Sequence, residues 1–168
     1  MVPKIIHQIW IGKKSNVIDN YRKTIKKFGV GFQYKLWTEK NISEFNLQEK
    51  YRNFSHPAFF ADIYRIHILN KYGGIYIDAD MEAIRPINIL WDKYKCYPIS
   101  SCYYKDHPDL GVIMSQHPYN FWHHISKNFN PTKSLIGSWR FIGTKKISDS
   151  YVGKSGSILK NKQLNSWF

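Results

Sequence analysis

Residues 71–80 read KYGGIYIDAD: the end of a helix, two glycines, a short apolar run and a pair of aspartates. Glycine just past the last helical residue is a common helix stop, so the glycine pair predicts the end of a helix. The apolar residues 75–77 then predict a short buried strand that runs directly into Asp78 and Asp80. Side chains at the carboxyl end of a strand in an open α/β sheet face the crevice where ligands bind. We therefore expect a binding site at this aspartate pair.

The two aspartates have the chemistry of a metal site. Residues two apart on an extended chain point the same way, so Asp78 and Asp80 would place two carboxylates on one side. Such hard oxygen ligands suit Mg²⁺ or Mn²⁺, which typically bridge protein carboxylates to substrate phosphates. A bare D-x-D pattern arises often by chance, but its position after a glycine stop and an apolar strand makes it more specific. The alternative interpretation is a solvated turn at the end of a strand.

The helix before this strand is predicted over residues 58–72. Pro57 stands at its start, where a missing N–H costs nothing, and apolar residues lie nearly all round it, which predicts a buried helix. Asp62 and Arg65 are three residues apart and share a face. Burying charges requires compensation, so this pair is either a simple intrahelical ion pair or a ligand-binding pair directed at the crevice near Asp78. The spacing alone favours neither interpretation.

The N-terminal part reads as strand, helix, strand. Residues 4–11 are rich in β-branched and aromatic residues and predict a buried first strand. Apolar residues recur at helical spacing over 17–28, and 32–37 resembles a second strand. This order is typical of the opening of a nucleotide-binding α/β fold. Trp10, at the carboxyl end of the first strand, either stacks on a nucleobase or belongs to the core. Thr38 is placed to cap the next helical piece.

The downstream pattern is weaker. It predicts a short turn of helix over 87–91, strands over 94–103 and 110–114, and a helix over 119–129. The fold class expected from the whole pattern is α/β, with a mainly parallel central sheet, in a single domain over residues 1–168.

The amino-acid composition limits the possible classes of protein but does not select one function. The formal net charge is +13, which attracts polyanions in general, and two cysteines are too few for a disulfide framework. The first residues do not resemble a signal peptide, and no stretch approaches the roughly 18 apolar residues of a membrane span. We therefore expect a soluble, cytoplasmic protein, with loose attachment to an anionic membrane through lysines as an open alternative.

Three segments together resemble a known family. They are PKIIHQIWIG at 3–12, ADIYR at 61–65 and KYGGIYIDAD at 71–80, and both their order and their spacing fit. The chain resembles the DXD-containing retaining glycosyltransferases, which include fungal α-mannosyltransferases, bacterial capsular polysaccharide enzymes and the catalytic domains of glucosylating toxins. The resemblance covers residues 3–86. It implies a GT-A (Rossmann-like) fold, a nucleotide-sugar donor, Mn²⁺ or Mg²⁺ as cofactor, and transfer of a hexose with retention of configuration.

The resemblance also implies roles for individual residues on the donor side. Trp10 would stack on the base, with the backbone of Ile9 nearby. Asp62 and Arg65 would bind the sugar of the donor.

The remaining implied roles concern the metal and the diphosphate. Asp80 would ligate the metal directly, and Asp78 would contact ribose and sugar hydroxyls and reach the metal through water. Asp78, Asp80 and Arg65 are thus the expected catalytic residues. Near the end of the chain, Ser166 would be a metal ligand and Trp167 a diphosphate contact, in a segment where Asn165 replaces the glycine of relatives.

The resemblance favours one donor but leaves the acceptor open. A UDP-hexose is the donor favoured by the resemblance, GDP-mannose stays open, and the acceptor is a glycan, a lipid-linked sugar or a protein. Nucleic acid is not expected as a partner, although a basic, aromatic-rich nucleic-acid-binding module is one alternative function. A degenerate protein that binds nucleotide sugars without turnover is another. A phosphatase of the haloacid dehalogenase type is disfavoured, because Glu82 stands where that pattern carries Thr or Val.

Overall fold

The computed structural model describes residues 1–47, 57–96, 99–104 and 107–128, and of residues 99–104, 107–110 and 128 it describes the backbone alone. Its strands are β1 (Ile5–Ile9), β2 (Gln33–Trp37), β3 (Gly74–Ile77), β4 (Ile99–Tyr104) and β5 (His107–Ser115). Its helices are α1 (Asn16–Phe28), the 3₁₀ turn η1 (Ile42–Phe45), α2 (Pro57–Tyr72), α3 (Ile87–Tyr94) and α4 (Asn120–Asn128).

The strands form one sheet in the order β2-β1-β3-β5-β4. β1 pairs in parallel with both β2 and β3, whereas β5 is antiparallel to β3 and to β4. Four of the five strands in the described ranges therefore run in the same direction, with β5 reversed among them. This confirms the α/β class and the mainly parallel sheet, and it adds an antiparallel insertion that the sequence pattern did not indicate.

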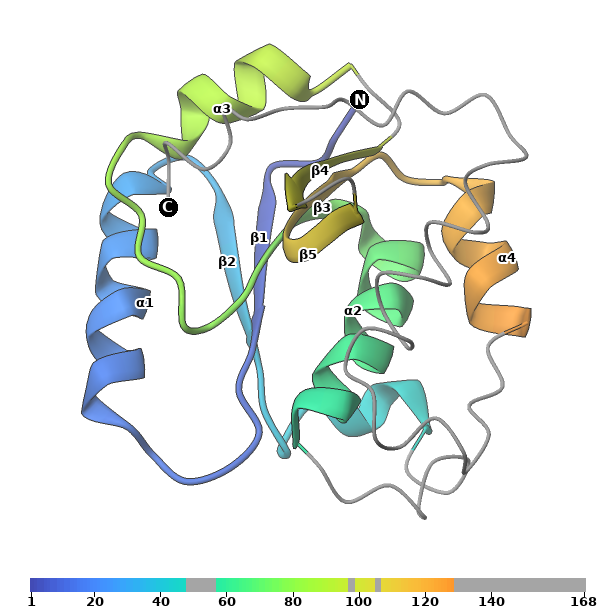
Figure 1. Ribbon diagram of the computed structural model, residues 1–168, viewed down its shortest axis with the longest axis horizontal. Coiled ribbons are helices and arrows are strands. Elements are labelled where there is room, and N and C mark those ends of the chain that lie inside the picture. The colour runs from blue at the N-terminus through green and yellow to red at the C-terminus, as the bar shows by residue number, and fades with distance from the viewer. Residues whose placement is uncertain (48–56, 97–98, 105–106, 129–168) are drawn as a thin grey trace.

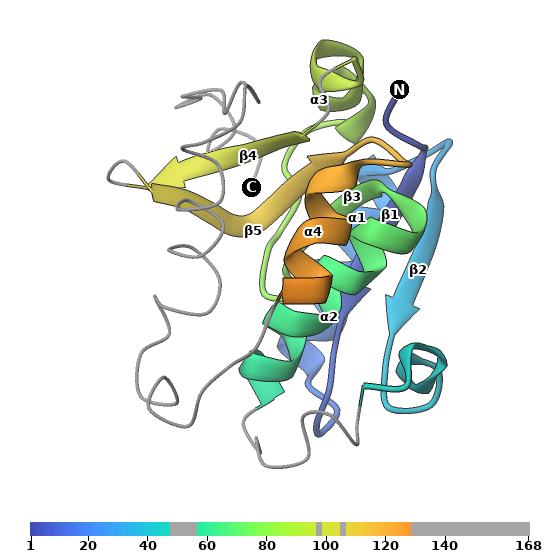
Figure 2. The ribbon, with the colours of Figure 1, turned by 90° about the vertical axis from the view of Figure 1, so that its right-hand side faces the viewer.

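The helices cover the two faces of this sheet, as Figure 1 shows with α1 on one side and α2 and α4 on the other. Figure 2, turned by 90°, shows α4 packed over α2 on the same face. Apolar side chains alternate between the faces because strand residues point alternately to opposite sides. Ile6, Ile75 and Ile77 pack with α1 and α3, whereas Trp37 and Tyr76 pack with α2 and α4. The result is a three-layer arrangement with a separate apolar cluster on each face.

The helix stop at the glycine pair is confirmed, and its geometry explains the residue type. α2 ends at Tyr72, and Gly73, with a φ of +61°, returns its N–H to the carbonyl of Leu69 at 2.9 Å. A side chain at Gly73 would also meet the Ser115 carbonyl at 2.9 Å. Left-handed backbone and close packing both require glycine here, and the chain then enters β3 without a loop.

Several predicted boundaries are wrong. α3 continues to Tyr94 instead of ending at 91, because Leu90 and Tyr94, one turn apart, both bury against the sheet. The strand expected over 94–103 consequently begins only at Ile99, and its partner β5 begins at His107 instead of 110. The segment after Thr38 is the short 3₁₀ turn η1, with Asn41 instead of Thr38 at its N-cap position. None of the helices described is long and apolar enough to cross a bilayer.

Candidate donor site

Asp78 lies immediately after β3, between β1 and β5, at the carboxyl end of the central strand. Its N–H donates to the Gly111 carbonyl at 2.7 Å, which extends the pairing with β5 by one residue. Its own carbonyl accepts from the side-chain amide of Gln8 at 3.1 Å and from the N–H of Met81 at 3.2 Å. The backbone of Asp78 is therefore held by both neighbouring strands and by the turn that follows it.

The carboxylate of Asp78 joins a cluster of side chains from β3 and α2. Tyr76 donates its hydroxyl to Asp78 Oδ1 at 2.7 Å, and Arg65 Nη1 lies 3.4 Å from the same oxygen. The other terminal nitrogen of Arg65 forms an ion pair with Asp62 on the same helix. The structure thus brings together Asp62, Arg65 and Asp78. The Asp62–Arg65 pair is an intrahelical ion pair that faces Asp78, and its role in ligand binding stays a prediction.

The electrostatics of the cluster follow from its burial. Arg65 is only 5% exposed and lies over the Tyr76 ring, with its guanidinium carbon 4.7 Å from the ring centroid. Burial raises the pKa of Asp62 despite the nearby Arg65 charge, and the Asp78 carboxylate adds to this rise. Burial likewise raises the pKa of the Tyr76 hydroxyl well above its usual value, so Tyr76 stays a hydrogen-bond donor. One cation is shared by two carboxylates, and the Asp78 side chain keeps 30% of its surface exposed for a ligand.

Asp80 differs from the expectation drawn from an extended chain. β3 ends at Ile77, and the chain turns at once, as the Met81 N–H to Asp78 carbonyl bond shows. The extended-chain argument for parallel carboxylates therefore fails. Asp78 is tied to the α2 cluster, whereas Asp80 is exposed on the turn.

The aspartate pair nevertheless fits a divalent cation of the Mg²⁺ type. Within the ranges described, no group of three or more His, Cys, Asp or Glu side chains forms a metal cage. Mg²⁺ does not need one, because it usually binds through one or two carboxylates and completes its shell with waters and substrate phosphates. The exposed Asp80 and the partly exposed Asp78 would supply two such carboxylates.

Trp10 lies at the carboxyl end of β1, the strand next to β3. Its backbone N–H continues the pairing with β2 by donating to the Trp37 carbonyl, and its indole N–H donates to the Lys13 carbonyl at 3.0 Å. Ile9, in contrast, packs into the α2 face of the core, so only its backbone is available to a ligand. The indole is half-buried and fixed by its own loop, which suits a flat stacking surface.

Ser166 and Trp167 lie outside the residues that the structure describes, so their roles stay predictions. Two residues that sequence reasoning missed are Tyr76 and Gln8, which hold the carboxylate and the carbonyl of Asp78 respectively. A signal for both was present in the sequence, because each is a hydrogen-bonding side chain inside a strand that is expected to be buried. A buried polar group needs a partner, and here that partner is Asp78.

A family comparison supplies the assignment that this geometry alone does not. The family described as "Glycosyltransferase sugar-binding region containing DXD motif" matches residues 14–97, half of the chain. The chain belongs to this family. The matched region contains Asp62, Arg65, Asp78 and Asp80, so the cluster and the aspartate turn lie within the sugar-binding region that the family description names.

Individual relatives agree with this assignment. An uncharacterized glycosyltransferase of Acanthamoeba polyphaga mimivirus is 28% identical over 173 residues, covering 89% of this chain and 64% of the relative. Inositol phosphoceramide mannosyltransferase 3 of Schizosaccharomyces pombe is 32% identical over 98 residues, covering 53% of this chain and 27% of the relative. A mannosyl phosphorylinositol ceramide synthase of Saccharomyces cerevisiae is 33% identical over 99 residues, covering 54% of this chain and 25% of the relative. The chain thus spans between a quarter and about two thirds of the length of these proteins.

Among solved structures, the glycosyltransferase PaToxG superimposes with a TM-score of 0.59 over 89% of this chain and 68% of its own, at 17% identity. At that identity the likeness concerns the fold, and it confirms the GT-A type of α/β arrangement.

Proposed function

We propose that this DXD glycosyltransferase domain transfers a hexose from a nucleotide-sugar donor to an acceptor hydroxyl, with retention of configuration and with a divalent cation. The observation that carries the proposal is the Asp62–Arg65–Asp78 cluster at the carboxyl end of β3, followed by the exposed Asp80. Ligands of open α/β sheets bind at this edge, so the cluster lies where a donor would be held.

The residues of the cluster have complementary tasks in this proposal. The Asp62 carboxylate, fixed by Arg65, accepts hydrogen bonds from sugar hydroxyls, and Arg65 donates to an oxygen of the donor. Asp78 accepts from ribose or sugar hydroxyls through its exposed part, while Tyr76 keeps its carboxylate in place. Asp80, with Asp78 and with Ser166 from the end of the chain, would hold Mn²⁺ or Mg²⁺, and the ion would supply positive charge to the leaving diphosphate.

This arrangement supports a mechanism that retains the anomeric configuration without a covalent intermediate on the protein. The carboxylates of Asp62 and Asp78 are both paired with Arg65, and Asp78 also accepts a hydrogen bond from Tyr76. Neither is a free nucleophile poised for a double displacement. We therefore infer that the acceptor hydroxyl attacks from the side of the departing diphosphate.

Two nucleotide sugars are candidates for the donor. A UDP-hexose is the first, on the resemblance of the motifs. GDP-mannose is the second, and the names of the fungal relatives, which are mannosyltransferases, favour it. The acceptor is a hydroxyl of a glycan, of a lipid-linked sugar or of a protein. We place the reaction in the cytoplasm or at the surface of an anionic membrane.

The decisive experiment is a calorimetric titration of the protein with UDP and with GDP, first with Mn²⁺ and then with EDTA. One nucleotide should bind with Mn²⁺ and lose at least about tenfold in affinity with EDTA, because the diphosphate loses its bridging ion. Asp80→Ala should cause the same loss, whereas Asp92→Ala, which removes an exposed carboxylate from α3, should leave binding unchanged. A nucleotide affinity that is equal with and without metal would contradict the proposal. So would an affinity of Asp80→Ala that equals that of the unchanged protein.

Turnover is measured separately, as release of the nucleotide from UDP-glucose, UDP-galactose and GDP-mannose. Hydrolysis or transfer that disappears in Asp80→Ala identifies the donor sugar. Metal-dependent binding with no turnover of any donor would instead indicate a domain that binds nucleotide sugars without catalysis.

A further inference from the structure

A groove of about 850 Å³ lies between α1 and the edge strand β2. Its lining comes from one flank of α1, from the segment just before that helix, and from the side chains of β2 that face it. Figure 1 shows α1 on the side of the sheet opposite to α2, so this groove lies on the other face from the Asp62–Arg65–Asp78 cluster. Its volume is in the range of small-molecule sites in proteins.

The lining of the groove is strongly cationic. Lys14, Arg22, Lys23 and Lys26 line it, against the carboxylate of Asp19. Several cations around one concavity focus a positive potential and attract an anion. The planar fork of an arginine matches the oxygens of a phosphate in particular.

The cations of the groove are incompletely paired by the protein. Arg22 forms an ion pair with Asp19 through one terminal nitrogen, but its Nε is a buried nitrogen for which the described residues supply no hydrogen-bond acceptor. Lys23 donates to the neutral amide oxygen of Asn20 at 3.1 Å, and Lys26 lies 4.8 Å from the centroid of the Tyr34 ring. The buried Arg22 Nε lacks an acceptor, which is costly, and the ammonium groups of Lys23 and Lys26 are exposed cations, so an anionic ligand that brings several oxygens suits this set of groups.

The same residues argue against nucleic acid as the occupant. Bases bind single-strand sites by stacking on free aromatic faces. Here Tyr34 is covered by Lys26 on its ring, and its hydroxyl donates to Gln8 at 2.8 Å. The groove therefore offers mainly charge and hydrogen-bond donors, and the Lys26 ammonium group already lies over its aromatic ring.

We propose that this groove between α1 and β2 is a phosphate-binding site, which takes the phosphate of a small phosphorylated molecule or of a lipid headgroup. The site is distinct from the donor site and does not depend on the proposed transfer reaction. Both sources of the ligand share the phosphate that the guanidinium and ammonium groups recognise.

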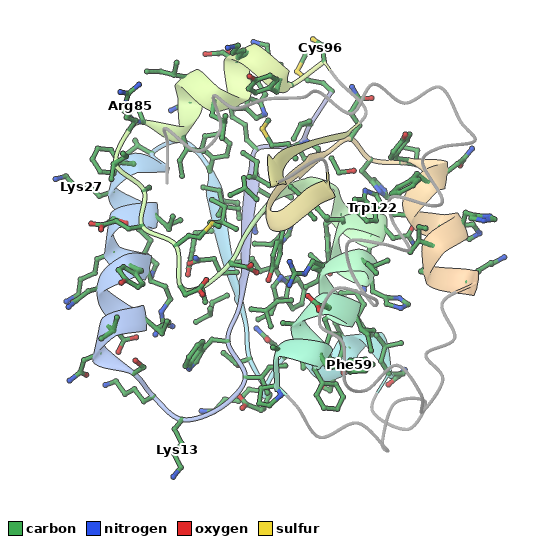
Figure 3. All side chains as sticks on the ribbon, in the orientation of Figure 1. Lys13, Lys27, Phe59, Arg85, Cys96 and Trp122 are labelled. Carbon is green, nitrogen blue, oxygen red and sulfur yellow. The ribbon has the colours of Figure 1, made fainter. Side chains whose placement is uncertain are left out.

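The test uses the whole chain and two variants with equal charge change. Lys23→Gln/Lys26→Gln removes two cations of the groove. Lys13→Gln/Lys27→Gln is the control, because Figure 3 shows both side chains extending away from the body of the protein, and neither lines the groove. Glycerol 3-phosphate is titrated by calorimetry, and flotation is measured with phosphatidylcholine vesicles that contain or lack phosphatidic acid.

Binding should weaken by roughly tenfold or more in the groove variant and by less than about twofold in the control. A groove-dependent affinity for glycerol 3-phosphate identifies a soluble phosphorylated ligand. Groove-dependent flotation that requires phosphatidic acid identifies a headgroup. Equal losses in both variants, or no binding of either probe, would overturn the proposal, as would a groove-dependent affinity for single-stranded RNA well above that for both phosphate probes.

Discussion

Arg65 on α2 and Asp78 at the end of β3 approach to 3.4 Å, and this ion pair joins a helix to the central strand at the candidate donor site. Because Arg65 also pairs with Asp62, one guanidinium sets the position of two carboxylates. The cluster is therefore part of the packing between α2 and the sheet as well as a candidate binding surface. Substitutions in it should affect stability and ligand binding together.

Replacement of Arg65 by lysine keeps the positive charge but removes the guanidinium group, whose two terminal nitrogens contact two carboxylates. A single ammonium group cannot reach Asp62 and Asp78 with the same geometry, so one partly buried carboxylate loses its partner. We expect the free energy of unfolding to fall by about 1–3 kcal/mol and the metal-dependent nucleotide affinity to fall at least about tenfold. Urea denaturation and calorimetry measure the two effects.

The matched control for this variant is Arg22→Lys. Arg22 pairs with Asp19 at the same helical spacing on α1, away from the donor site. This change should cost less than about 1 kcal/mol and leave the metal-dependent nucleotide affinity intact, because Arg22 lines the groove beside α1 and not the donor site. An Arg65→Lys protein that binds nucleotide as well as Arg22→Lys would contradict the assignment of Arg65.

The Tyr76 hydroxyl holds the Asp78 carboxylate from the interior of β3. Tyr76→Phe preserves the packing of the ring beneath Arg65 and removes only this hydrogen bond. A hydrogen bond to a charged group contributes about 1.5–3 kcal/mol, so the free energy of unfolding should fall by that order. Nucleotide affinity should fall severalfold, because Asp78 loses one of the two groups that position it. Tyr119→Phe is the comparison, and a stability loss with unchanged nucleotide affinity would limit Tyr76 to a structural role.

The main elements could be predicted from the sequence because their signals are local. The glycine stop, the apolar strand and the aspartate pair occupy ten consecutive residues, and the structure confirms helix, stop and strand in that order. The predicted helix ended at residue 91 although no stop signal follows that residue, and only packing against the sheet shows that Tyr94 still belongs to α3. Local patterns define elements well and their ends less well.

The sequence could predict which residues belong to the candidate site, but not how their side chains lie relative to one another. Residue spacing places Asp62 and Arg65 on one helical face, but only the tertiary structure shows that this face meets Asp78. The turn at the aspartate pair was missed, because β3 already ends at Ile77 and the chain turns directly after it. The groove beside α1 was also beyond prediction, since its two walls meet only when α1 packs against β2.

The burial of His7 leads us to expect that the protein loses stability at acidic pH. It is buried in β1, where its Nε2–H donates to the Gly73 carbonyl at 3.0 Å and its Nδ1 accepts from the Trp37 indole at 3.2 Å. Burial lowers the pKa of His7 to about 4 from the usual 6.5, and the nearby Lys35 charge acts in the same direction. Between these two values the unfolded chain binds a proton that the folded protein does not, so stability is complete above pH 6.5 and falls as the pH drops toward 4.

The His7 contribution should reach about 3 kcal/mol of unfolding free energy between pH 7 and pH 4. Urea denaturation across this range measures the slope, and His7→Gln should flatten it even if the variant is less stable at pH 7. An NMR titration gives the pKa of the ring directly, with the exposed His124 as an internal comparison. A His7 pKa near 6.5, or an unchanged slope in His7→Gln, would contradict this account.

Gly74 connects the helix stop to β3 at a point where β1 leaves no room for a side chain. Its φ is +91°, and an added Cβ would lie 2.6 Å from the Ile5 carbonyl and 3.1 Å from His7 Nε2. Gly31 supplies a matched control, because its φ is +87° and an added Cβ meets nothing within 4 Å. Gly31→Ala should therefore show the cost of the backbone conformation alone, about 1–2 kcal/mol. Gly74→Ala should cost at least about 2 kcal/mol more, because β1 and β3 must separate to admit the methyl group. Equal losses of unfolding free energy in the two variants would mean that β1 yields to the methyl group, and that the close approach of these strands does not fix the backbone leading to Asp78.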